Sequence, residues 1–512
     1  MKLWIGGSSG LAQTYFNTFA KRGTVISGRR NHHRQRGRAG VGGPNRDDEA
    51  AEDDESWILL GCERTLPDWI LQLQQQQQDP GHCNYHYIYC DFHQLEDSDL
   101  QRVWDDIHLT VRRSSSHSHS TTIDSVVIGI RPPLVTYRTN SDAFRYNNSV
   151  VDGLHRFLQS LLSPPPSLLS QDAATTNIRL VVHISSIAAI DHIATQHLRS
   201  IRRNSNGARD VTTPTKNNPN NSNNSNRVQK PQPQQPQPDD PSYTELQYPY
   251  DRFKRQCEMM IEQLVQEINR NNHNINQNHH DDHHTILYTS LRLGAIFSDS
   301  PHCIQCSALW LQYLFGGPYL STPIDCNSSY NVSQLIHEIL LSFAPVTTST
   351  TAATTTTSNT TTTIKSLRPV YYYTRCVSQY PYPVPYGEHF LSYRNVHGTP
   401  IGSSILPILV PQILIEYGVV RLLHVITLFL QWVQSHCRRM TMWFSSLSSS
   451  SSPWSMVPPY LESMDYLLQV TVREHTFDMT ETIADFPNVL RVEETVDECF
   501  RRRRRLQQQR RL

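Results

Sequence analysis

Short apolar runs alternate with longer amphipathic stretches along much of the chain. The runs are rich in β-branched and aromatic residues and end at turn residues, which predicts β-strands. A helical pattern of apolar positions follows several of these runs. This alternation predicts an α/β fold, with a mostly parallel sheet and helices on both faces. The expected strands are 2–5, 24–27, 87–90, 125–130, 179–184 and 285–293, and the expected helices are 11–21, 95–107, 142–162 and 250–269.

Polar low-complexity segments interrupt this alternation. They contain too few apolar residues to offset the entropy lost when a chain becomes ordered. Because long surface loops cost little free energy, we expect these segments to loop out of one folded assembly. They are residues 31–56, 74–79, 114–121, 200–240 and 347–363, and the Ser-rich stretch 445–452.

Charge and cysteine content narrow the classes of function. The 46 Lys and Arg residues balance 46 Asp and Glu residues, so a uniformly basic surface is excluded and no nucleic-acid partner is expected. The ten cysteines are scattered and the first residues lack the apolar segment of a secretory signal, which predicts reduced thiols in a protein that is not secreted. Cys303 and Cys306 form a C-x-x-C pair, but no second pair stands at zinc spacing. We expect ordinary thiols there and no metal site.

A glycine-rich turn follows the first expected strand. It reads Gly6-Gly7-Ser8-Ser9-Gly10-Leu11, and a helical pattern begins at once. Glycines allow the backbone to approach a ligand closely, and the unpaired N–H groups of a helix N-terminus attract negative charge. The order of strand, turn and helix predicts a Rossmann-type doubly wound domain. All six residues of this turn are expected to contact the pyrophosphate of a dinucleotide cofactor.

Charged residues after two later strands bear on the choice of that cofactor. Arg29 and Arg30 follow the expected strand 24–27, and paired arginines suit the extra phosphate of NADP. We therefore expect NADP, with NAD as the alternative; the two arginines could instead only begin a basic insert. Asp91 follows the strand 87–90 and is expected either to contact the adenine amino group or to cap a helix.

A serine, a tyrosine and a lysine form the candidate catalytic group. Tyr250 and Lys254 are four positions apart, so on a helix they share one face, and Ser186 ends the expected strand 179–184. A nearby ammonium stabilises a phenolate and brings the tyrosine pKa toward the working range. Lys254 could also hold the nicotinamide ribose, and Ser186 the substrate oxygen. Asn147 and Asn148 are expected to extend a proton relay or to cap a helix.

These motifs together resemble the short-chain dehydrogenase/reductase superfamily. Within it the sequence is similar to the extended branch of 3β-hydroxysteroid dehydrogenase/isomerases and sterol 4α-carboxylate 3-dehydrogenases. The resemblance covers most of the chain outside the inserts. It is carried by residues 6–12, 181–187, 248–254, 291–297, 330–336 and 383–391.

The resemblance implies roles for the candidate residues. Tyr250 is the expected acid/base, Lys254 its electrostatic helper and ribose ligand, and Ser186 the hydroxyl that orients the substrate. Ser185 is the less favoured serine, because the family's residue is usually the second of the pair. The resemblance also leaves a homodimer open.

An apolar segment near the C-terminus predicts contact with a membrane surface. Residues 405–433 carry polar side chains within one arc of a helix, which favours a helix lying in the interface; packing on the substrate lobe is the alternative. The arginines of 501–505 could add attraction to anionic lipid, or serve as a nuclear signal or a solvated end. We expect the cytoplasmic face of an intracellular membrane, such as the endoplasmic reticulum, or the cytoplasm.

The expected domains and activity follow from these assignments. The predicted activity is an NAD(P)-dependent conversion between a secondary alcohol and a ketone on a steroid, sterol or similarly small apolar substrate. A nucleotide-sugar epimerase or aromatic ketone reductase, and a non-catalytic NADP-sensing scaffold, are the alternatives. The domains are a Rossmann domain at 1–298, a small substrate lobe at 299–400, a membrane-associated helix at 401–440, a C-terminal lobe at 441–500 and a basic tail at 501–512.

Overall fold

The fold is known from a computed structural model. It describes residues 1–7, 9–20, 56–76, 84–115, 122–132, 140–163, 176–190, 246, 248–276, 285–300, 303–315, 320, 322–342, 372–380, 383–398, 425, 429, 482–483 and 494–509.

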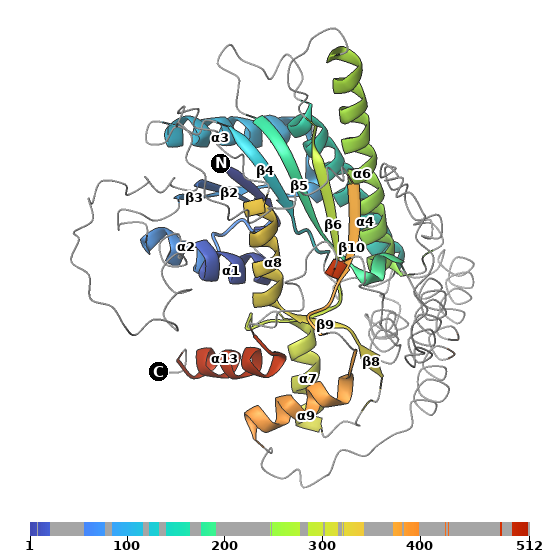
Figure 1. The fold of residues 1–512 in the computed structure, drawn as a ribbon. Helices are drawn as coiled ribbons and strands as arrows, with labels where there is room; N and C mark the ends of the chain where they lie inside the picture. The colour runs from blue at the N-terminus through green and yellow to red at the C-terminus, as the bar shows by residue number, and fades with distance from the viewer. Residues whose placement is uncertain are drawn as a thin grey trace, which may run out of the picture.

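A seven-stranded parallel sheet forms the centre of the molecule (Figure 1). All strand pairs in this sheet are parallel. The order β10-β6-β5-β4-β1-β2-β3 places β1 between β4 and β2, with β2 and β3 on one side and the later strands on the other. This is the doubly wound arrangement of a Rossmann fold, so the predicted fold class is confirmed. The strands are β1 (Lys2–Ile5), β2 (Ser56–Gly61), β3 (Asn84–Tyr89), β4 (Ile123–Ile128), β5 (Thr176–Ser186), β6 (Leu287–Leu293) and β10 (Tyr372–Val377).

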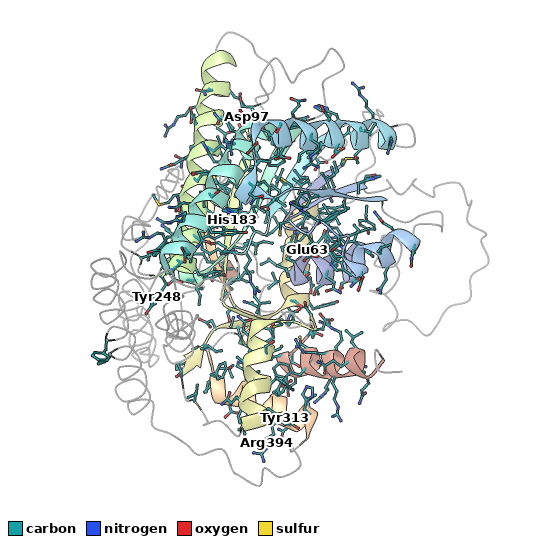
Figure 2. All side chains as sticks on the ribbon, turned by 180° about the vertical axis from the view of Figure 1, so that it is seen from behind. Glu63, Asp97, His183, Tyr248, Tyr313 and Arg394 are labelled. Carbon is teal, nitrogen blue, oxygen red and sulfur yellow. The ribbon has the colours of Figure 1, made fainter. Side chains whose placement is uncertain are left out.

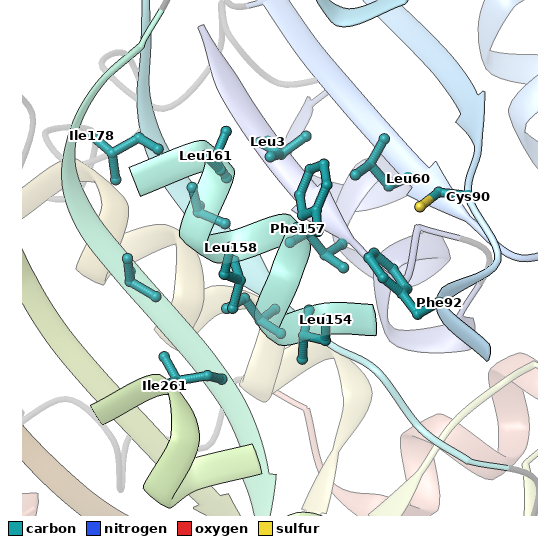
Figure 3. Close-up of a cluster of buried hydrophobic side chains, with 14 of the residues drawn as sticks. Leu3, Leu60, Cys90, Phe92, Leu154, Phe157, Leu158, Leu161, Ile178 and Ile261 are labelled. Atoms are coloured by element: carbon teal, nitrogen blue, oxygen red, sulfur yellow. The ribbon is translucent and has the colours of Figure 1, made fainter. Parts of the chain in front are cut away.

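Helices cover both faces of the sheet. Successive residues of β1 point to opposite faces, so Leu3 packs into one apolar core and Trp4 into the other. The first core, part of which Figure 3 shows, lies under α3 (Asp97–Ser115), α4 (Asn140–Leu162) and α6 (Pro249–Asn276). The second lies under α1 (Gly10–Tyr15), its continuation η1 (Phe16–Ala20), α2 (Asp68–Gln76) and α8 (Ser329–Ser342). Short helical turns lie at η2 (Phe92–Gln94) and η3 (Ile187–Ile190).

The strand beside β1 is not the one that the sequence predicted. The expected strand 24–27, together with Arg29 and Arg30, lies outside the described residues, and β2 at Ser56–Gly61 occupies its place in the sheet. All six residues of β2 are buried. The insert expected at 31–56 therefore ends one residue too late, because the buried run of β2 begins at Ser56. The insert expected at 74–79 also begins too early, because α2 extends through Gln76.

A small lobe follows β6 at the carboxyl end of the sheet. Gly294 joins β6 directly to β7 (Ala295–Phe297), which pairs with β9 (Cys326–Ser328). A second pair is formed by β8 (Pro323–Ile324) and β11 (Val384–Pro385). Three helices complete the lobe around a core that includes Phe297 and Phe500. They are α7 (Ile304–Phe315), α9 (Tyr386–His397) and α13 (Val496–Gln509), and Figure 2 marks the lobe by Tyr313 and Arg394.

Two elements of the expected substrate lobe return to the Rossmann part. β10 is the edge strand beside β6, and α8 packs against α1. The arginines 501–505 belong to α13 and so to the folded lobe. The apolar segment 405–433 lies outside the described residues except for Val425 and Phe429. Among the helices that the structure describes, none combines the length and apolarity needed to cross a bilayer.

The burial of β2 can be tested by truncating one of its leucines. Leu59 is fully buried, so Leu59→Ala should leave a cavity and lower the free energy of unfolding by about 2 to 5 kcal/mol. Leu71, on α2, is 41% exposed and supplies the matched control, for which Leu71→Ala should change the stability little. Urea denaturation of the three proteins measures both effects. Equal effects of the two substitutions would contradict the assignment of β2.

Candidate functional site

The glycine-rich turn lies between β1 and α1 and contacts β2 and the small lobe. The N–H groups of Gly6 and Gly7 both donate to the carbonyl of Leu60, at 2.9 and 2.7 Å. Gly6 has φ of +85°, a conformation that favours glycine. A Cβ at Gly10 would lie 2.8 Å from the Cβ of Ser300, so only glycine fits beneath that serine.

The start of α1 has the form that the motif predicted. The Ser9 hydroxyl caps the helix by accepting the N–H of Ala12 at 3.2 Å. Leu11 is partly buried and packs against the core beneath α1. Ser8 lies outside the described residues. This tight cradle, in which added side chains would collide, fits a dinucleotide pyrophosphate.

The carboxyl end of β2 supplies residues that the sequence reasoning missed. Cys62, Glu63 and Arg64 follow β2 directly and are exposed. The Arg64 guanidinium lies over the ring of Tyr89, 5.8 Å from its centroid, and its Nε donates to the Tyr89 hydroxyl at 3.4 Å. Arg102 approaches the same ring, at 5.9 Å. The sequence analysis expected a cofactor-binding group after the second strand, and this group follows the strand that lies beside β1; Arg29 and Arg30 lie outside the described residues.

Asp91 follows β3 and acts as a cap. Its carboxylate accepts the N–H of His93 at 3.0 Å and begins η2. This is the capping role that the sequence left as one of two alternatives. The expected contact with adenine stays a prediction.

Tyr250 and Ser186 meet at the carboxyl end of β5. Ser186 is the last residue of β5, and Tyr250 is the second residue of α6. A hydrogen bond links their side chains. Burial raises the pKa of Tyr250, while the positive charge of Arg131 and the bond from Ser186 act in the opposite direction. The phenol is therefore protonated at neutral pH, with groups in place that favour its ionised form.

Lys254 lies one turn further along α6 and is buried. Its Nζ donates to the carbonyl of Ile130 at 2.8 Å and to the carbonyl of Ile184 at 3.1 Å. These carbonyls belong to the ends of β4 and β5, so a single ammonium joins both strands to α6. Burial lowers the pKa of Lys254 to about 8. The structure thus brings together the serine, tyrosine and lysine that the sequence proposed.

Arg131 is a second cation at this site that the sequence analysis did not consider. It follows Ile130 just beyond β4, and its side chain is exposed. Its charge lowers the pKa values of both Tyr250 and Lys254. The positive charge that lowers the pKa of the phenol therefore comes from Arg131, whereas the sequence analysis expected this effect from Lys254. Only the fold brings the end of β4 to the start of α6, so spacing in the sequence could not reveal this residue.

Asn147 holds the first residue of α6 by a hydrogen bond. It lies on α4, and its amide Nδ2 donates to the carbonyl of Pro249 at 2.9 Å. Its Oδ1 is buried without a hydrogen-bond partner among the described residues. Asn147 therefore holds the N-terminus of α6, next to Tyr250, across the gap between two helices.

A buried ion-pair network lies beneath the catalytic residues. Glu258, one turn after Lys254, accepts from Arg292 on β6 at 2.8 and 3.0 Å and from Arg255 at 3.2 Å. Although burial raises the pKa of Glu258, the charge and hydrogen bonds of Arg292 outweigh it and lower that pKa to about 2. His183, labelled in Figure 2, is buried beside this network, and burial lowers its pKa to about 3. The network attaches α6 to β6, the strand beside the edge strand β10.

The comparisons with known proteins are limited to structural likeness. No family model and no curated protein matches the chain. The solved structures similar to it include gox2253, with a TM-score of 0.47, 10% identity and coverage of 100% of this chain and 98% of that one. The enzyme WbmH of Bordetella bronchiseptica, in complex with NAD+, has a TM-score of 0.41 and 9% identity, with coverage of 98% and 96%. A UDP-N-acetylglucosamine 4-epimerase of Methanobrevibacter ruminantium M1 has a TM-score of 0.37 and 12% identity, with coverage of 80% and 89%. These likenesses are too weak to indicate an activity, which is therefore inferred from the site itself.

The site combines a phosphate cradle with a proton-handling group. The cradle starts from β1, and the Ser186, Tyr250 and Lys254 group starts from β5 and α6, both at the carboxyl edge of the same sheet. Ligands of doubly wound folds bind at this edge. Among the described residues no cluster of three or more His, Cys, Asp or Glu side chains is arranged to hold a metal ion.

The ion-pair network predicts a specific acid sensitivity. The pKa of Glu258 is lower in the folded chain than its ordinary 4.5, so its contribution to stability is present above about 4.5 and is lost as the pH falls toward 2. Glu258→Gln should lower the free energy of unfolding at neutral pH by about 3 to 5 kcal/mol, because it leaves Arg292 buried without its partner. The difference from the wild type should shrink below pH 4.5 in urea denaturation.

Asp106 provides the control for this substitution. Its pair with Arg102 is exposed, with 4.0 Å between the charged atoms. Asp106→Asn should change the stability by less than about 1 kcal/mol at any pH. A pH-independent effect of Glu258→Gln would show that lost packing, rather than lost charge, is responsible.

Proposed function

We propose that this chain is an NAD(P)-dependent oxidoreductase of the short-chain type that interconverts a secondary alcohol and a ketone. The observation that carries the proposal is the hydrogen bond between Ser186 and Tyr250, at the same sheet edge as the glycine-rich turn. The buried ammonium of Lys254 lies one helical turn from the phenol. These groups supply a proton donor, a second hydroxyl for the substrate oxygen and positive charge beside both.

The residues of the chain divide the chemistry between them. The nicotinamide, when bound, supplies or accepts the hydride. In the oxidative direction Tyr250 takes the proton of the substrate hydroxyl while Ser186 hydrogen-bonds the oxygen; reduction reverses these steps. The charge of Arg131 favours the phenolate form of Tyr250, which accepts the proton, and the ammonium of Lys254 lies one helical turn away. The turn from Gly6 to Leu11 holds the pyrophosphate.

We rank three alternatives for what the site acts on or binds. A steroid, sterol or similar apolar alcohol is the first, following the resemblance of the sequence. A sugar nucleotide or an aromatic ketone is the second, and a chain that binds NADP without turnover is the third. Contact with a membrane surface and a homodimer stay predictions.

The catalytic assignment is tested by removing one hydroxyl. Tyr250→Phe should lower turnover by about a hundredfold or more, because it removes the acid/base group, while dinucleotide affinity stays nearly unchanged. Absorbance at the nicotinamide band reports turnover on a panel of 3-hydroxy and 3-keto sterols, aromatic ketones and UDP-sugars. Tyr313→Phe, in the small lobe, is the control. Undiminished turnover of Tyr250→Phe would remove this residue from the mechanism, and bound NADPH without turnover across the panel would favour the scaffold.

The choice of cofactor is tested at Arg64. We propose NADP as the preferred cofactor, because Arg64 and Arg102 flank Tyr89 where the ribose phosphate would lie. Arg64→Ala should weaken NADPH binding about tenfold, or ~1.4 kcal/mol, and leave NADH binding nearly unchanged. Fluorescence titration with both dinucleotides measures this, with the exposed Arg505 as the control position for Arg505→Ala. Equal losses for NADPH and NADH would contradict a phosphate-specific contact.

A further inference from the structure

Two cysteines at the start of α7 form a pair inside the small lobe. Cys303 directly precedes α7, and Cys306 lies in its first turn. The N–H of Cys306 donates to the sulfur of Cys303 at 3.5 Å. Residues three apart in an α-helix have Cα atoms about 5 Å apart, which is within the range that a disulfide spans. The geometry therefore allows the two sulfurs to be joined with little backbone movement.

The two sulfurs differ in their surroundings. Hydrogen bonds from the side chain and backbone of Cys306 lower the pKa of Cys303 to about 6, against the effect of burial. The pKa of Cys306 is raised well above its ordinary value by the same hydrogen bond and by burial. A thiolate next to a protonated thiol is the arrangement in which one sulfur attacks an oxidant and the other resolves the product.

The cysteine pair is connected to the glycine-rich turn through one short segment. The single S–H of Cys306 is shared between the sulfur of Cys303 and the carbonyl of Ser298, whose oxygen lies 3.3 Å from the Cys306 sulfur. The N–H of Cys303 donates to the carbonyl of Ser300 at 3.2 Å. Ser300 in turn lies where a Cβ on Gly10 would collide with it.

Arg503 of α13 holds the same segment from the other side. Its Nη1 donates to the carbonyls of Ser298 and Ser300, at 3.2 and 2.6 Å. The segment against the proposed pyrophosphate site is therefore held by the thiol of Cys306, the N–H of Cys303 and the guanidinium of Arg503, together with an ion pair of Arg502 and Asp299 at 2.9 Å.

We propose that Cys303 and Cys306 are a reversible dithiol–disulfide site that weakens dinucleotide binding when oxidised by a peroxide. The thiolate of Cys303 attacks one oxygen of hydrogen peroxide and releases hydroxide, which takes up a proton to become water. The sulfur of Cys306 then displaces the hydroxyl of the resulting sulfenic acid, which leaves as a second water with the Cys306 proton. Two electrons pass from sulfur to peroxide, and one S–S bond forms.

Oxidation changes the contacts of the connecting segment. The disulfide has no S–H, so the bond from Cys306 to the Ser298 carbonyl is lost and Arg503 alone holds that carbonyl. We expect Ser300 to shift against Gly10 and the pyrophosphate cradle to fit less well. This effect on binding rests on the proposed function, whereas formation of the disulfide does not.

Disulfide mapping of the full chain tests the site directly. Reduced protein is titrated with hydrogen peroxide, the remaining thiols are alkylated, and peptides are identified by mass. The expected result is a peptide that carries Cys303 and Cys306 and is lighter by two hydrogens, and that dithiothreitol returns to the reduced form. Alkylation of both cysteines after peroxide has oxidised the exposed Cys62, or a link from Cys303 to the nearby Cys499, would overturn the proposal.

Single substitutions separate this pair from its neighbour. Cys303→Ser and Cys306→Ser should each abolish the disulfide, and Cys499→Ser, a change in the same core, should retain it. Where a variant fails to fold, the alkylation rate of Cys303 in the wild type replaces it. That rate should reach its half-maximal value below the ordinary thiol pKa of 9.0, because the hydrogen bonds of Cys306 lower the pKa of Cys303; a midpoint at or above 9.0 would contradict a thiolate at this position.

NADPH titration tests the coupling. The oxidised wild type should bind NADPH several-fold more weakly than the reduced protein, and peroxide should not change the affinity of Cys306→Ser. Equal affinity before and after oxidation would overturn the coupling while leaving the mapped disulfide in place. Reduced protein that binds neither NADPH nor NADH would instead contradict the proposed function.

Discussion

The candidate site depends on one buried ammonium. An amine in a largely apolar interior is costly unless its donors find partners, and carbonyls just beyond β4 and near the end of β5 accept two of the three N–H groups of Lys254. The same two bonds fix where α6 lies against the sheet, and therefore where Tyr250 stands relative to Ser186. The ion pair of Glu258 and Arg292 repeats this attachment one turn deeper in the core. One face of α6 therefore both positions Tyr250 and helps to hold the core together.

Local motifs account for the part of the site that the sequence predicted. The glycine-rich turn is a continuous stretch whose neighbours, β1 and α1, are adjacent in sequence. Tyr250 and Lys254 share a helix, so their spacing alone places them on one face. Ser186 ends a strand rich in β-branched residues, a local pattern that already places it at the carboxyl edge of the sheet. Each of these inferences used contacts that short-range geometry determines.

Contacts between distant segments explain what the sequence did not reveal. β2 directly follows the acidic end of the insert expected at 31–56, so its six buried residues were not recognised as the neighbour of β1. The group of Arg64, Tyr89 and Arg102 is assembled from three separate segments, and the charge of Arg131 acts on the phenol of Tyr250 only because β4 lies beside β5. The return of α8 and β10 to the Rossmann part is likewise a matter of topology, which no local pattern specifies.

The position of Arg503 has a consequence for the order in which the protein can be completed. The glycine-rich turn is made within the first dozen residues, yet the segment that rests on Gly10 is held by an arginine almost five hundred positions later. During synthesis the ribosome delivers α13 only after the whole sheet and most of the small lobe have emerged. A nascent chain that has not reached this helix would carry every residue of the cradle without the clamp that closes it.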